Sequence, residues 1–479
     1  MALLAVLSWA AVYGETNSPA VQLSQPEKLK LNAGADLRVR QEIMHNVPGL
    51  PGAPGAMMPA ARKEAINHIR YRPRVWGRAD FGNFGLYMRL ADEMREHIVK
   101  HGQRRDDRSY NFPDEIILDN LYLEGLKLFD EFLDFRIGRQ DLFDGQHSVL
   151  GLDHLMLDGA PYVGSRSCYA DMARFTLHPA DDQKLDLFAL YDDGRNDVGW
   201  ASHGARARPM NAIHPGDSPD MDEWGGGAVW SSDLFEKALP YQLYAVHKRT
   251  ENYRSPSGVH MDKKQVTALG ARIMPQITDE FSLDFEGARQ FGEKARGSKQ
   301  AGGTLGYAAA DFHPHVSRTW QPFIRPSAYY LSGDKHRTDD AHDNDTSWDP
   351  MWARAPCDSE LFQYGTLYGL GYWSNIIYTK LTLGAEFGPH HRLVVYSGPL
   401  WAAAQDHLGH ADGSGDSMFK GLLSSARYDF PIRLAPKAAQ GWDRFEIFGH
   451  LIGEVFNPGD YYDTSKPAYF IRWEFTFKF

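Results

Sequence analysis

The sequence predicts an all-β fold: a transmembrane antiparallel β-barrel of about 18 strands with long extracellular loops. Apolar and polar residues alternate with a period of two through most of the 479 residues, as in strands with one apolar and one polar face. After Gly14 no apolar run approaches the roughly 18 residues that a spanning helix needs, so a membrane form of this chain must be a closed barrel. Short links alternate with long polar ones, which is typical of periplasmic turns and outer loops.

The composition agrees with a large β structure. The chain has 45 Gly, 13% aromatic residues and 2 Cys, too few for a disulfide scaffold. Its formal net charge of −11 argues against nucleic acid as a partner. The segment 1–14 (MALLAVLSWAAVYG) resembles a secretory signal, although no Lys or Arg precedes its apolar run, which is consistent with a truncated start. A buried first helix is the alternative for this segment. We expect residues 15–479 to form a single outer-membrane barrel domain.

Eighteen segments fit the two-residue period, and their boundaries are uncertain by a few residues. In chain order they are 28–43, 68–81, 84–90, 116–126, 132–140, 165–178, 184–192, 239–248, 266–274, 281–291, 304–312, 319–331, 361–372, 376–387, 392–402, 418–430, 444–455 and 468–479. The short links include Gly82–Asn83 and Thr278–Asp279. The long ones include 95–114, 193–237 and 332–360.

Arginine gathers on one face of the early strands. In 68–81, Arg70, Arg72 and Arg74 share a face opposite Ile69 and other apolar residues. Across the tight turn, Arg89 is expected on the same side of the next strand. An arginine that faces lipid costs roughly 2 to 4 kcal/mol at the bilayer midplane. The arginine face should therefore line the lumen.

The last segment, AYFIRWEFTFKF, supports a bacterial outer-membrane barrel most directly. Six apolar side chains from Tyr469 to Phe479 alternate with Arg472, Glu474, Thr476 and Lys478, and the chain ends on an aromatic residue.

Several short motifs, in this order, resemble the alginate-export family of outer-membrane porins. They are Arg70, Arg72 and Arg74; Tyr87-Met88-Arg89 with Asp92-Glu93; Asp119-Asn120-Leu121-Tyr122; Gly138-Arg139-Gln140 with Gly145; Asp158-Gly159; Ser165-Arg166; Tyr330-Leu331-Ser332-Gly333-Asp334; Trp348-Asp349-Pro350; and Phe456-Asn457-Pro458-Gly459-Asp460. The resemblance covers most of the mature chain. It implies a barrel in the outer membrane of a Gram-negative bacterium that passes an anionic polysaccharide or its uronate fragments, without fixing the sugar or the direction.

Arginine suits this passage because its charge is permanent and its planar fork can bind a carboxylate with two donors. Many weak sites let an anion enter and leave. The candidate lumen residues for substrate binding are Arg70, Arg72, Arg74, Arg89, Arg136, Arg139, Arg166, Arg174, Arg325 and Arg472. Asp119, Glu124, Asp171 and Glu474 are candidate gates or partners. Bracing of the wall stays open as a role for each arginine, whereas the row of Arg70, Arg72 and Arg74 beside Arg89 favours substrate contact.

No catalytic residue, cofactor or metal is expected. The acidic stretch 339–349 departs from an EF-hand because Trp348 takes the place of the required glycine. The expected partners are an anionic oligo- or polysaccharide, outer-membrane lipid and periplasmic export or uptake proteins. Two alternatives remain: a less selective anion or carbohydrate porin, and a secreted soluble β-rich enzyme that acts on polysaccharide.

Overall fold

The computed structural model describes most of the chain from Lys28 onward. The described residues are 28–46, 66–92, 94–98, 116–142, 148–156, 169–192, 199–201, 223–234, 238–251, 253–254, 260–261, 263–294, 299–317, 319–335, 344–353, 359–361, 374–406, 415–435 and 444–479. The predicted signal segment 1–14, the candidate Arg166 and both cysteines lie outside them.

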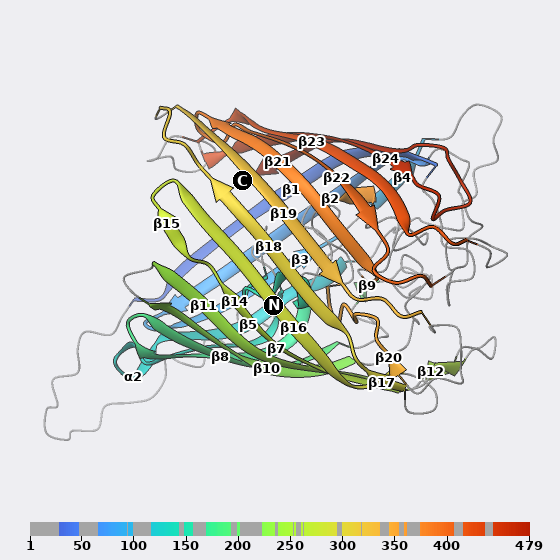
Figure 1. The fold of residues 1–479 in the computed structure, drawn as a ribbon. Coiled ribbons are helices and arrows are strands. Elements are labelled where there is room, and N and C mark those ends of the chain that lie inside the picture. Colours follow the sequence, from blue (N-terminus) through green and yellow to red (C-terminus); the bar gives the residue numbers. More distant parts are fainter. Residues whose placement is uncertain are drawn as a thin grey trace, which may run out of the picture.

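The described part of the chain forms a closed antiparallel β-barrel of 18 strands, as the sequence predicts (Figure 1). The wall strands are β1 (Lys30–His45), β2 (Ile66–Phe81), β3 (Phe84–Ala91), β5 (Ile116–Lys127), β6 (Leu133–Asp141), β7 (Tyr169–Ala180), β8 (Gln183–Asp192), β10 (Glu223–Leu234), β11 (Leu239–Thr250), β14 (Lys264–Ile273), β16 (Phe281–Lys294), β18 (Thr304–Phe312), β19 (Trp320–Leu331), β21 (Ile376–Phe387), β22 (Arg392–Trp401), β23 (Phe419–Arg433), β24 (Glu446–Pro458) and β25 (Ala468–Lys478). The short elements are β4 (Met94–His97), β9 (Gly199–Ala201), β12 (Tyr253–Arg254), β13 (His260–Met261), β15 (Gln276–Thr278), β17 (Lys299–Ala301), β20 (Asn344–Asp345), α2 (Leu128–Glu131) and α3 (Asp153–Met156).

The barrel closes between its first and last strands. β1 pairs with β25 in antiparallel register from Asp36 opposite Lys478 to His45 opposite Tyr469. Each other wall strand pairs with its neighbours along the chain, so every strand edge in the described wall has a partner. The short turns and α2 lie at the left end in Figure 1, whereas β12, β17 and β20 in the long connections lie at the right end. We take the long-loop end as extracellular.

The two faces of the wall differ as the alternation predicts. Leu86, Leu123, Ile137, Phe175 and Leu187 are exposed large apolar side chains on successive strands. Their neighbours along each strand turn into the barrel and include charged residues such as Glu124, Arg136 and Arg174. A cylinder with an apolar outer belt and a polar interior satisfies its backbone within the wall and suits a bilayer. No helix within the described ranges is long and apolar enough to cross a membrane.

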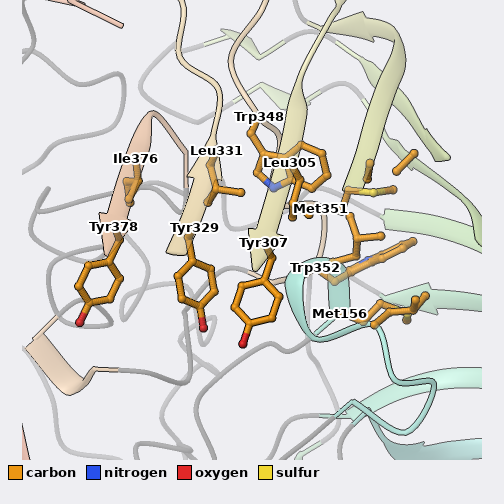
Figure 2. Close-up of a cluster of buried hydrophobic side chains, with 14 of the residues drawn as sticks. Met156, Leu305, Tyr307, Tyr329, Leu331, Trp348, Met351, Trp352, Ile376 and Tyr378 are labelled. Carbon is orange, nitrogen blue, oxygen red and sulfur yellow. The ribbon is translucent and has the colours of Figure 1, made fainter. Parts of the chain in front are cut away.

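Two segments from the long connections fold into the barrel. Residues 148–156, which include α3, and residues 344–353 pack against the inner faces of the strands. Figure 2 shows Trp352 and Met156 of these segments side by side, with Trp348 near Leu305. It also shows Tyr307, Tyr329 and Tyr378, from β18, β19 and β21, in a row with their hydroxyl groups pointing the same way. The interior therefore contains an apolar cluster as well as ion pairs.

The predicted number of strands is correct, but the prediction that 193–237 is a loop is wrong. The range 193–237 contains β10, whose sequence EWGGGAVWSSDL conceals the alternation because three consecutive glycines have no side chains. The predicted strand 361–372 lies outside the described residues except for Leu361, which is helical.

Candidate functional site

A buried carboxylate, Glu42 of β1, lies at the centre of the inner face formed by β25, β1 and β2. It accepts hydrogen bonds from His68 Nε2 at 2.8 Å, Arg70 Nη1 at 3.3 Å and Arg472 Nε at 2.9 Å. Arg40 Nε lies 3.1 Å from the same carboxylate. All five side chains are buried. Charges taken out of water are stable only when they are paired and hydrogen-bonded. We therefore interpret this cluster as a brace, a set of ion pairs that holds the three strands together.

The other members of this arginine row lie at either side of Glu42. Glu474 of β25 lies 3.8 Å from Arg38 and 3.6 Å from Arg40. Arg74 donates from Nε to both oxygens of Asp36 at 3.0 Å. Arg72 lies opposite Arg38 in the strand register. The predicted row is thus on one inner face, with Arg70 buried and Arg72 and Arg74 half-buried.

A second group of arginines follows β3 to β7. Arg89 contacts Asp119 and binds Asp141 through Nη2 at 2.7 Å. Arg136 donates to Glu124 from Nε at 3.1 Å and from Nη2 at 2.8 Å.

A third group continues on β7 and on β16 to β19. Arg174 binds Asp186 at 2.9 Å. On the far wall, Arg325 lies 3.5 Å from both Asp284 and Asp311, and it donates to the Tyr307 hydroxyl at 2.7 Å. The ion pairs therefore extend around much of the inner wall.

In three of these pairs the guanidinium is more exposed than its carboxylate, whereas in the pair of Arg89 and Asp141 the carboxylate is the more exposed partner. Arg136 is 36% exposed against 3% for Glu124, Arg325 is 34% against 8% for Asp284, and Arg174 is 19% against 0% for Asp186. The carboxylates lie against the wall and orient the cations toward the lumen.

Arg139 is set apart from the other candidates. It lies opposite Leu121 in the register, and Leu121 and the neighbouring Ile137 are exposed on the outer face. Its fork binds Asp171 with two contacts of 2.9 Å. Gly138 beside it has a φ of +124°, where a Cβ would meet the Leu121 carbonyl oxygen at 2.3 Å. The structure does not bring Arg139 together with the lumen arginines.

The infolded segment 344–353 is held by matched polar contacts. Asp349 donates from its backbone N to Gln290 Oε1 at 2.8 Å, and its carbonyl accepts from Gln290 Nε2 at 2.6 Å. Lys248 Nζ donates to the Met351 carbonyl at 2.7 Å. Trp352 N donates to the Leu155 carbonyl at 3.0 Å and so joins the two infolded segments.

The α3 segment is held by a buried cluster at Glu286. His154 Nδ1 lies 2.7 Å from Glu286 Oε2, and the Tyr244 hydroxyl donates to the same carboxylate at 2.6 Å. Burial lowers the pKa of His154, but the Glu286 carboxylate outweighs it, and the net pKa is raised. The protonated imidazole therefore favours the infolded position.

A cavity of about 410 Å³ remains beside these segments. Its cations come from Arg272, Arg325, Lys380, Arg392 and Arg427, and its aromatic rings from Tyr307, Phe323, Tyr329 and Tyr396. A second cavity of about 460 Å³ lies toward the short turn at His390 and shares Glu386, Arg392 and Arg427 with the first. The two cavities therefore adjoin each other at these shared residues.

Sequence reasoning missed several of these lining residues. Arg272, Arg392 and Arg427 each lie in a predicted strand, and each alternates with exposed or half-buried apolar residues. The same inward-face criterion that selected Arg70 would have found them. Lys380, whose Nζ lies 5.1 Å from the centre of the Tyr396 ring, could have been found in the same way.

No protein-family model and no curated protein sequence matches the chain. Solved structures do match. OpdK of Pseudomonas aeruginosa with vanillate has a TM-score of 0.53 at 10% identity over 94% of this chain and 98% of that one. A BenF-like porin from Pseudomonas fluorescens Pf-5 has 0.51 at 9% identity over 93% and 98%. OccAB1 of Acinetobacter baumannii has 0.51 at 9% identity over 94% and 96%.

The likeness shows the fold, which is that of outer-membrane porins. Together with the apolar outer belt, it identifies the chain as an outer-membrane β-barrel. These solved structures are not alginate-export proteins, so membership of that family stays a prediction.

Proposed function

We propose that the protein is an anion-selective channel that passes small carboxylates, oligouronates among them, down their gradient across the outer membrane. The observation that carries the proposal is the layering of three lumen ion pairs, those of Arg136, Arg174 and Arg325, with carboxylates against the wall and guanidinium groups toward water. Low-dielectric walls focus the field of such cations. Selection of anions by this lumen requires no covalent chemistry and no cofactor.

The proposed contact residues are the partly exposed arginines. Arg136, Arg174 and Arg325 present their forks to the lumen, and Arg74 and Arg89 do so to a smaller extent. The buried Arg70 fits a brace around Glu42. Each exposed fork keeps a carboxylate partner, so an entering anion shares the cation, which keeps binding weak enough for release.

The cavity size favours short solutes. A space of about 410 Å³ between the infolded segments and the wall has room for one or two sugar rings. Tyrosine and phenylalanine rings beside the cations could stack on the apolar face of a sugar or another ring. A uronate polymer would have to pass as an extended strand, unit by unit.

A less selective anion porin is the second candidate, and the periplasmic end favours it. Glu386 is more exposed than Arg392, and Asp429 slightly more than Arg427, the reverse of the order in the Arg136, Arg174 and Arg325 pairs. Acids at this exit would weaken anion selectivity. The apolar outer belt argues against the secreted soluble enzyme. Outer-membrane lipid is the proposed partner of that belt, and periplasmic transport proteins are the proposed partners at the exit.

Neutralising the exposed lumen arginines tests the proposal. In Arg136→Gln and Arg325→Gln we expect the anion-to-cation permeability ratio to fall by a factor on the order of two to five, because each change removes a cation from the lumen. The carboxylate partners stay paired, Glu124 with Arg78 and Asp284 with Arg272. The measurement is the reversal potential of single channels in a KCl gradient.

Arg289→Gln is the matched control. Arg289 is exposed on the outer face in alternation with the exposed Phe285 and Phe291, so its loss changes the net charge equally without touching the lumen. Equal selectivity in the lumen variants, the control and the wild type would refute the proposed role of these arginines.

A further inference from the structure

The carboxylate of Glu360 binds the guanidinium group of Arg472. Glu360, in the described segment 359–361, accepts from Arg472 Nη1 at 2.6 Å and from Nη2 at 2.9 Å. Each donor reaches a different oxygen, so this is the two-bond geometry in which arginine binds a free carboxylate. The contact joins residues 112 positions apart, from a loop to a wall strand.

The fork is held rigidly from behind. Glu42 accepts a hydrogen bond from Arg472 Nε at 2.9 Å and is itself bound by His68 and Arg70. The guanidinium is therefore fixed whether or not Glu360 is present. A fixed fork binds a carboxylate with little loss of side-chain freedom.

Glu360 lies between this fork and the open space. It lines the cavity of about 410 Å³, whereas Arg472 is only 1% exposed. Removal of Glu360 from its position would therefore connect the fork to the cavity.

Glu454 of β24 holds the segment in place. It accepts from the Ser359 hydroxyl at 2.8 Å, from Glu360 N at 3.2 Å and from Leu361 N at 2.9 Å. Because these contacts use the backbone and Ser359, they do not need the Glu360 carboxylate. The contacts that hold the segment to Glu454 are thus separate from the carboxylate that binds Arg472.

The geometry points to Arg472 as a binding site for the carboxylate of the transported solute, which Glu360 occupies as a tethered competitor. This inference rests on the proposed function and adds one specific binding site to it. A solute carboxylate in the cavity takes the same two donors when the Glu360 side chain swings away. The ligand class is a small carboxylate, such as a single uronate. The competing explanation is that the pair only braces the loop.

The competition has a calculable effect. If Glu360 occupies the fork for about nine-tenths of the time, the apparent affinity of a solute falls about tenfold, in proportion to the empty fraction. We therefore expect Glu360→Ala to bind D-glucuronate about tenfold more tightly than the wild type. Titration calorimetry on the purified, detergent-solubilised barrel measures this, with glucose as the probe that lacks the carboxylate.

Two variants complete the experiment. Glu386→Ala removes another acid from the same cavity, away from Arg472, and should change the affinity for glucuronate less than twofold. Glu360→Ala with Arg472→Gln should lose the gain, while a heat-modifiable band on gels confirms that the barrel has folded. Glu42 keeps Arg40, Arg70 and His68 in that variant.

The outcomes separate the inference from the proposed function. Unchanged or weaker glucuronate binding in Glu360→Ala would overturn the inference even in an anion-selective channel. Equal gains in Glu360→Ala and Glu386→Ala would also overturn it, because general charge would then explain both. A gain that requires Arg472 supports it even if the wild-type channel does not select anions.

Discussion

Replacing Glu42 by glutamine is expected to cost about 3 to 5 kcal/mol of the free energy of unfolding, the usual cost of breaking a buried ion pair from one side. Arg40, Arg70 and Arg472 would then share a buried site without the carboxylate that all three contact. The site also spans the seam between β1 and β25, which closes the barrel. Urea unfolding in detergent, followed by the shift between the folded and unfolded bands on gels, measures the change.

Asp36→Asn is the matched control on the same strand. Asp36 pairs with Arg74, and both side chains are partly exposed, so water can replace the lost contact. We expect a cost of about 1 kcal/mol or less. If Glu42→Gln were no more destabilising than Asp36→Asn, the buried cluster would not be the brace described above.

Trp348→Ala is expected to release the infolded segment 344–353 and to raise the single-channel conductance severalfold. Trp348 is 1% exposed and packs inside the barrel with residues such as Leu305 and Leu331. Loss of such a side chain costs about 3 to 5 kcal/mol. Because Trp348 belongs to a loop, this cost falls on the docking of the loop rather than on the wall strands.

The control for this variant is Trp230→Ala, which removes a tryptophan 38% exposed on the outer face of β10. Its conductance should equal that of the wild type. An unchanged conductance in Trp348→Ala, with a folded barrel, would show that segment 344–353 does not limit the channel.

The alternation of residues predicted the wall and the direction of its side chains. In β25 the period is unbroken, so Arg472 and Glu474 were correctly placed inward, and the tight turn at Gly82–Asn83 is present between β2 and β3. In β10 the pattern failed because Gly225, Gly226 and Gly227 give no polarity signal. Periodicity depends on side chains and cannot detect strands that lack them.

The partners of the arginines could not be predicted in the same way. The two-residue alternation predicts that Arg70 faces inward. The burial of its neighbour Glu42, however, depends on the pairing of β1 with β25, which come from opposite ends of the chain. Glu360 reaches Arg472 from a loop, and no local pattern encodes that contact. Arg139 differs again, since it lies on the outer face of a strand whose other arginine, Arg136, faces inward.

The most direct test of the account is the reversal potential of the wild-type channel in a planar bilayer under a KCl gradient. Guanidinium groups that face the lumen and are backed by buried carboxylates predict a reversal potential on the chloride side. They also predict a current that D-glucuronate blocks more than glucose does. A cation-selective channel, or equal block by the two sugars, would contradict the claim that the arginines of the lumen select anions.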